Sequence, residues 1–175
     1  TGPRQDGHRH LHLLPQGPAD QGTLDHVHLW ARGGFGPIEI GILSRLHDLP
    51  AQRGQAPAGL TFWQLGQTDA KPSQKWFSYT PYLLARHPKA WGRDSAQLQL
   101  LRECAQRGLP QPQVSVLPSD GRSYQVHRGP RKGPPGPPAW YRLDFPQPIS
   151  GPLCLGANAH FGMGRFLPTF PRELL

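Results

Sequence analysis

The predicted fold follows from residues 24–49, which read LDHVHLWARGGFGPIEIGILSRLHDL. Apolar and polar residues alternate over residues 24–31, a period of two that is typical of a strand with one buried face. A cluster of glycines then interrupts the pattern, and Pro37 suits the first turn of a helix. Apolar residues at helical spacing continue to Leu49, so we expect a strand, a tight connection and a helix in that order.

The rest of the chain extends this strand–helix unit in both directions. A second helix is predicted from Asp94 or Ser95 to Arg107. Gly108 then supplies a stop signal. Alternation or short apolar runs predict strands over residues 8–14, 60–65, 75–80, 114–117, 123–127, 140–145, 151–155 and 160–167. The order from Leu24 onward predicts an α+β fold: a ferredoxin-like (RRM-like) βαββαβ plait with additional C-terminal β-hairpins and a glycine-rich loop.

Composition favours one small folded domain over residues 1–175. The chain includes 21 Gly and 22 Pro, a level that suggests disorder, but 36% of its residues are hydrophobic and they include 5 Trp, 4 Tyr and 7 Phe. No apolar run approaches the roughly 20 residues that a membrane span needs, and no signal peptide is visible. Cys104 and Cys154 are too few for a disulfide scaffold or a four-cysteine zinc site, so we expect a cytoplasmic protein.

Charge indicates an anionic partner. The chain has 19 Lys and Arg against 11 Asp and Glu, a formal net charge of +8, and most of the cations are Arg. Arg suits bidentate contacts with phosphate, which favours nucleic acid; a basic proteome rich in Arg codons is the alternative. Residues 79–93 mix Arg86 and Lys89 with aromatic residues, as RNA backbone contacts and base stacking require, although a solvated basic loop would look similar. Arg131 and Lys132 form a second basic centre in a loop rich in Pro and Gly.

A glycine-rich stretch near the C-terminus could also approach a phosphate. Glycines let backbone N–H groups come close to an anion, and a nearby cation could add charge. The stretch is not a P-loop, because the Gly-Lys-Ser/Thr ending is missing. A tight turn in a β-rich tail is the alternative interpretation. The residues concerned are Gly156, His160, Gly162, Gly164 and Arg165.

Histidines are the most unusual feature of the sequence. Five of the nine fall in two short predicted strands: His8, His10, His12, His26 and His28. Residues on the same face of paired antiparallel strands lie about 5 Å apart between Cβ atoms, so the two sets could face each other. Three interpretations are open: a polar solvent-facing surface, a metal site, or metal-independent RNA cleavage. In the last of these, imidazoles exchange protons with the 2′-hydroxyl and the 5′-oxygen near neutral pH.

Four segments together resemble a known family: GHRHLHLLP (7–15), LDHVHLWARGGF (24–35), WFSYTPYLLARHPKAWGR (76–93) and LGANAHFGMGRFLP (155–168). Their order is similar to that in the C-terminal half of the CRISPR repeat-processing proteins of the type I-U (also called I-G) systems. In that family a crRNA-capping domain is fused to a repeat-cleaving endoribonuclease domain, and both belong to the RAMP superfamily, which is built on ferredoxin-like folds. The resemblance implies a single RAMP-type endoribonuclease domain from the C-terminal part of a longer fusion protein.

The resemblance also implies an activity. Such nucleases cut the repeat of precursor CRISPR RNA without a metal or other cofactor, leaving a 2′,3′-cyclic phosphate and a 5′-hydroxyl, and often keep the product. The expected partners are therefore the repeat RNA and other subunits of a CRISPR effector (Cascade-like) complex, with no membrane. By position, the predicted catalytic residues are His10, His12 and His26, acting as general base and general acid in roles that the sequence does not assign.

The residues predicted to bind RNA combine the basic segments with the glycine-rich stretch: Arg86, Lys89, Arg131, Lys132, Gly156, His160, Gly162, Gly164 and Arg165. Among them, Lys89 is the candidate for stabilising the phosphate during cleavage. Two other functions stay open. A non-catalytic RNA-binding subunit that caps a CRISPR ribonucleoprotein would need the basic surface but no shared histidine cluster, and a metal-dependent phosphohydrolase would need a metal site.

Overall fold

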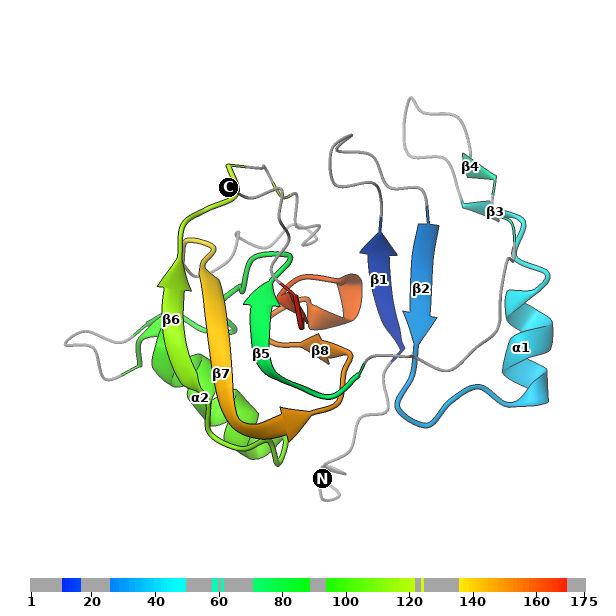
Figure 1. Ribbon diagram of the computed structural model, residues 1–175. Helices are drawn as coiled ribbons and strands as arrows, with labels where there is room; N and C mark the ends of the chain where they lie inside the picture. The colour runs from blue at the N-terminus through cyan, green and yellow to red at the C-terminus, as the bar shows by residue number, and fades with distance from the viewer. Residues whose placement is uncertain are drawn as a thin grey trace, which may run out of the picture.

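The computed structural model describes residues 11–16, 26–49, 58–59, 61, 71–88, 94–121, 124 and 136–169 (Figure 1). Within these residues the chain has two α-helices and three antiparallel sheets. The expected α+β class is therefore confirmed. Neither of the described helices has the length and the apolar character that crossing a bilayer requires.

The largest sheet has five antiparallel strands in the order β6-β7-β5-β9-β8. They are β5 (Ser73–Ser78), β6 (Gln113–Leu117), β7 (Trp140–Ile149), β8 (Leu153–Cys154) and β9 (Arg165–Leu167). Strand β7 lies between β6 and β5, so Leu143 stands opposite both Val114 and Trp76. The strands expected near residues 75–80, 114–117 and 140–145 are confirmed, as is the terminal strand pair.

Helix α2 (Ala96–Gln106) shares one apolar core with this sheet. The Leu98 N–H donates a hydrogen bond of 3.3 Å to the Ser95 hydroxyl at the N-cap, and Gly108 follows the helix with a φ of 70°. The predicted helix and its end signals are thus confirmed. The core consists of Trp76, Tyr82, Leu84, Leu100, Cys104, Tyr141, Leu143, Phe145, Ile149, Leu153, Leu155 and Phe166.

The N-terminal part of the chain forms smaller units beside the five-stranded sheet (Figure 1). Strands β1 (His12–Gln16) and β2 (His26–Trp30) pair as an antiparallel ribbon, called the ribbon below. Strand β3 (Asp48–Leu49) pairs with β4 (Ala58–Gly59). Helix α1 (Pro37–Leu43) ends earlier than expected, because Asp48 and Leu49 belong to β3.

The prediction that the strands from Leu24 onward form one sheet is wrong. Strand β2 pairs with β1, whereas β5 and β6 belong to the five-stranded sheet. Alternation predicts that a segment is a strand, but a period of two carries no information about its partner. Strand β7, expected only as an additional strand, takes a central place because it buries Leu143 and Phe145 in the core shared with α2. The strands expected over residues 60–65 and 123–127 lie almost wholly outside the described residues.

Candidate functional site

The ribbon packs against the glycine-rich turn that joins β8 to β9, here called the glycine turn (residues 156–164). Leu14 of β1 is buried together with Cys154 and Ala159, and Trp30 of β2 packs against this small cluster. The turn contains a short 3₁₀-helix, η2 (Ala159–Phe161), which Figure 1 shows beside β1. The candidate site lies at this contact between the ribbon and the turn.

Two residues of the glycine-rich stretch fix the ribbon in place. Gly162 has a φ of 80°, and a Cβ atom there would lie 2.4 Å from the Pro15 ring, so only glycine fits. The buried guanidinium of Arg165 donates a hydrogen bond of 3.1 Å to the Pro15 carbonyl oxygen and lies 5.4 Å from the centre of the Tyr79 ring. Burial lowers the pKa of Arg165 from its ordinary value. Both residues were predicted to contact RNA, and the structure gives both a role in joining the ribbon to the sheet.

The register of the ribbon decides which histidines meet. His12 stands opposite Trp30, and His26 stands opposite Gln16. His12 and His26 share one face, as expected, but four residue positions separate them along the ribbon. This amounts to roughly 13 Å. In this register His12 does not face His26, so pairing of the two strands does not bring these two histidines together.

His12 instead meets Trp30 and His160. The ring centroids of His12 and His160 are 5.0 Å apart. Those of His12 and Trp30 are 5.3 Å apart, and these two rings meet edge to face. His12 Nδ1 lies 3.3 Å from the Ala159 carbonyl oxygen. A carbonyl oxygen can only accept a hydrogen bond, so this contact places the proton of the neutral ring on Nδ1 and leaves Nε2 as the basic nitrogen. The structure thus brings together two imidazoles and an indole.

His26 and His28 form a second pair along β2. Their ring centroids are 5.1 Å apart, and His26 Nε2 lies 2.8 Å from the side-chain oxygen of Gln16. Partial burial, followed by the charges of His26 and Arg165, lowers the pKa of His28. A histidine with a lowered pKa is mostly neutral at pH 7, so His28 is poorly suited to donate a proton there.

The glycine turn is held by hydrogen bonds within the turn and to neighbouring segments. The backbone N–H groups of the three glycines that were predicted to approach a phosphate donate to protein oxygens at 2.8–3.2 Å: Gly156 to the Glu103 carboxylate, Gly162 to the Ala159 carbonyl and Gly164 to the Pro81 carbonyl. These contacts support the alternative interpretation of the stretch as a tight turn. A contact of these glycines with RNA stays a prediction.

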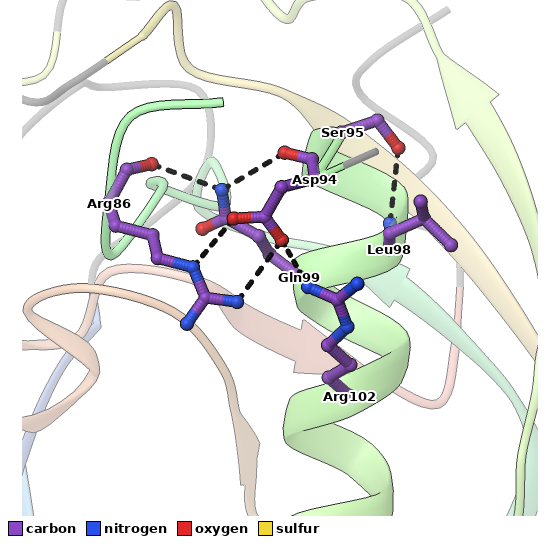
Figure 2. A network of polar contacts seen from close by, with 6 residues as sticks. All are labelled: Arg86, Asp94, Ser95, Leu98, Gln99 and Arg102. Atoms are coloured by element: carbon purple, nitrogen blue, oxygen red, sulfur yellow. Dashed lines mark hydrogen bonds and ion pairs between the residues drawn. The ribbon is translucent and has the colours of Figure 1, made fainter. Parts of the chain in front are cut away.

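Arg86 belongs to a polar network at the start of α2 (Figure 2). Its guanidinium donates to both carboxylate oxygens of Asp94, from Nε at 2.6 Å and from Nη2 at 3.1 Å, and Arg102 of α2 pairs with the same carboxylate. The Gln99 side-chain amide donates to the carbonyl oxygens of Arg86 and Asp94, at 3.0 and 3.2 Å. Neither Asp94 nor Arg102 was singled out for function from the sequence. An Arg eight residues before an Asp on a turn gives no local signal of an ion pair.

Four predicted site residues, His10, Lys89, Arg131 and Lys132, lie outside the described residues. Among the residues that are described, no group of three or more His, Cys, Asp or Glu side chains is arranged to hold a metal ion. Burial raises the pKa of the Cys104 thiol to about 12 and that of Cys154 to about 11, so both thiols are protonated core groups.

No protein-family model, curated protein or solved structure matches this chain.

Proposed function

We propose that the protein is an endoribonuclease that cleaves the repeat of precursor CRISPR RNA by attack of a 2′-hydroxyl on the adjacent phosphorus. The observation that supports it is the pair of imidazoles, His12 and His160, with ring centroids 5.0 Å apart beside Trp30. Such a reaction needs one group that accepts a proton and another that donates one, and imidazole does both near pH 7. The proposal includes a cytoplasmic location and retention of the product within a CRISPR effector complex.

In the proposed reaction His12 is the general base, because the Ala159 carbonyl favours the tautomer whose Nε2 is basic. His12 takes the proton of the 2′-hydroxyl as its oxygen bonds to phosphorus. His160 gives a proton to the 5′-oxygen as the P–O5′ bond breaks. The products are a 2′,3′-cyclic phosphate and a 5′-hydroxyl, and the two histidines end in exchanged protonation states. Trp30 offers a ring on which a neighbouring base could stack.

The ferredoxin-like part of the proposal rests on the order of strands after Ser73. Along the chain the elements are β5, α2, β6, β7 and finally β9. In the sheet the four strands lie in the order β6, β7, β5, β9, so the second strand along the chain is followed by the third, the first and the fourth. A βαββαβ plait has that order, and here the glycine turn stands where its second helix would be. We therefore propose that the five-stranded sheet is a reduced ferredoxin-like plait and that the ribbon is an addition to it.

The test compares His12→Ala and His160→Ala with His47→Ala, an exposed histidine of the connection after α1. Labelled repeat RNA is incubated with each protein in EDTA. We expect both site variants to cut about 10²- to 10⁴-fold more slowly with RNA affinity nearly unchanged, and the His47 variant to cut normally. A 2′-deoxy substitution at the scissile nucleotide should block cleavage.

Three other outcomes would contradict the proposal. Cleavage that needs added metal would indicate a metal-dependent phosphohydrolase. Binding without cleavage would indicate a non-catalytic RNA-binding subunit. A larger loss of activity in His26→Ala than in His160→Ala would favour the catalytic residues predicted from the sequence, which are His10, His12 and His26.

A further inference from the structure

Phe161 is an exposed aromatic residue in the glycine turn. It follows His160 directly and is 64% exposed. All other aromatic residues in the part of the chain that the structure describes are buried or half-buried. Covering an aromatic ring removes a large apolar area from water, so a ring that stands in solvent beside the candidate site is available to a ligand.

The backbone on both sides of Phe161 is fixed. Ala159, two positions earlier, is buried. The Gly162 carbonyl oxygen, one position later, accepts a hydrogen bond of 2.6 Å from the Thr80 hydroxyl. The Phe161 N–H itself donates a hydrogen bond of 2.9 Å to the Asn158 carbonyl oxygen. A Phe side chain has only two rotatable torsions, so a ring on such a backbone loses little conformational entropy when a ligand covers it.

A planar ring in this position suits a nucleobase. Unpaired bases of RNA stack on aromatic side chains, and such contacts tolerate different sequences because every base has a π-face. Single exposed apolar side chains are common on protein surfaces and need no ligand, and Val116 of β6, which is 68% exposed, is such a residue. Phe161 differs from Val116 in its planar ring and in adjoining His160, which belongs to the imidazole pair.

The position of Phe161 in the chain indicates which base it would contact. In the proposed reaction His160 gives a proton to the 5′-oxygen of the nucleotide that follows the scissile phosphate. The base of that nucleotide is joined to the same ribose as this oxygen, and neighbouring Cα atoms such as those of His160 and Phe161 are about 3.8 Å apart. Trp30, in contrast, lies beside His12, which takes the proton of the preceding nucleotide. The two aromatic residues therefore adjoin different members of the histidine pair.

We propose that Phe161 binds the base of the nucleotide on the 3′ side of the scissile phosphate by stacking. The inference rests on the proposed function, because the scissile phosphate defines that nucleotide. Phe161 binds the substrate in this site and transfers no proton. A purine has two fused rings and covers more of the Phe161 ring than a pyrimidine does, so the site favours a purine at this position.

The experiment measures affinity by fluorescence anisotropy, at one salt concentration, for a repeat RNA that carries 2′-deoxy at the scissile nucleotide. A second RNA is the same except that it lacks the base immediately 3′ of the scissile phosphate. Phe161→Ala should bind the complete RNA about tenfold more weakly than the wild type does. On the RNA that lacks the base, the two proteins should bind within about twofold of each other, because the stacked base is already missing.

Two further comparisons test the chemistry of the contact. Val116→Ala is the matched control, because it removes an equally exposed apolar side chain from another part of the sheet, and it should bind both RNAs as the wild type does. Replacing a purine by a pyrimidine at the same nucleotide should weaken binding about threefold in the wild type and leave Phe161→Ala unchanged.

Several results would overturn this site. They are wild-type affinity of Phe161→Ala for the complete RNA, an equal further loss on the RNA that lacks the base, or an equal loss in Val116→Ala. Normal RNA binding together with lost self-association would make the ring a protein contact instead. If Phe161→Ala fails to fold, as shown by its thermal unfolding, Phe161→Leu decides, because leucine is apolar but has no π-face. Wild-type affinity in Phe161→Leu would exclude stacking.

Failure of the nuclease proposal would be recognised separately. The RNA used for binding is not cleavable, so affinity does not depend on catalysis. If the wild type cuts no RNA, bases are removed one at a time along the repeat. A single position at which Phe161→Ala causes no further loss would keep the stacking site and remove the nuclease, whereas a loss at every position would remove both.

Discussion

The five-stranded sheet and the ribbon are held in place to very different degrees. Among the residues that the structure describes, the sheet and α2 share a core of twelve buried residues, whereas the ribbon packs on a cluster of three, Leu14, Cys154 and Ala159, with Trp30 beside it. The ribbon should therefore separate from the sheet at a much lower free energy than the sheet unfolds. The candidate chemistry lies between the two, so one region supplies stability and the other completes the site.

The largest effect is expected where a side chain would break the sheet itself. In Gly164→Ala the new Cβ atom would lie 1.7 Å from the Leu155 carbonyl oxygen, and the φ of 58° adds strain. Backbone atoms of the paired strands β8 and β9 cannot move aside cheaply, so we expect a loss of about 4 kcal/mol or more in the free energy of unfolding. Urea denaturation followed by circular dichroism would measure it.

Gly108→Ala is the control for that variant. Gly108 also has a positive φ, of 70°, but a Cβ atom there would meet nothing within 4 Å. The loss in the free energy of unfolding should come from the backbone conformation alone and amount to about 1 kcal/mol. Equal losses in the two variants would show that the close packing of the glycine turn against Leu155 contributes nothing.

An intermediate effect is expected where a side chain would separate the two regions. In Gly162→Ala the new Cβ atom would press on the Pro15 ring of β1, which belongs to the ribbon and not to the sheet. We expect the sheet to keep its free energy of unfolding to within about 1 kcal/mol, while the amide protons of the ribbon exchange much faster. Cleavage of repeat RNA should be lost, because His12 no longer meets His160. Unchanged exchange in the ribbon would contradict the attachment described for it.

The smallest predicted effect is a loss of stability at acidic pH. Burial and neighbouring charges lower the pKa of His28 in the folded protein below its ordinary value of 6.5. The unfolded chain then binds a proton more readily than the folded one, so stability falls as the pH drops through about 6.5 and the loss is complete below the folded pKa. Attachment of the ribbon should weaken over this range. His28→Gln should make it less sensitive to acid, as measured by hydrogen exchange at pH 7 and pH 5.

Signals that act between near neighbours in the sequence predicted the sheet strands and α2. The hydroxyl of Ser95 and the positive φ of Gly108 define the ends of α2 through contacts within a few residues. Alternation likewise located β2, because a period of two is a property of the segment alone. The class of the fold followed from these local patterns.

Pairing between distant segments could not be predicted in the same way. His12 and Ala159 are 147 residues apart, and no pattern in either segment shows that η2 packs on β1. The register that places His12 opposite Trp30 depends on how the ribbon packs on the glycine turn, which a single sequence does not contain. Arg86 was expected at an RNA surface, and its capture by Asp94 depends on a turn that brings the two side chains together.

The distance in sequence between β1 and η2 also has a consequence for synthesis. His160 and the Arg165 side chain that binds the Pro15 carbonyl are synthesised almost 150 residues after β1. Until then β1 and β2 can pair only with each other, and the sheet lacks β9. The His12–His160 pair can therefore form only after η2 has been synthesised.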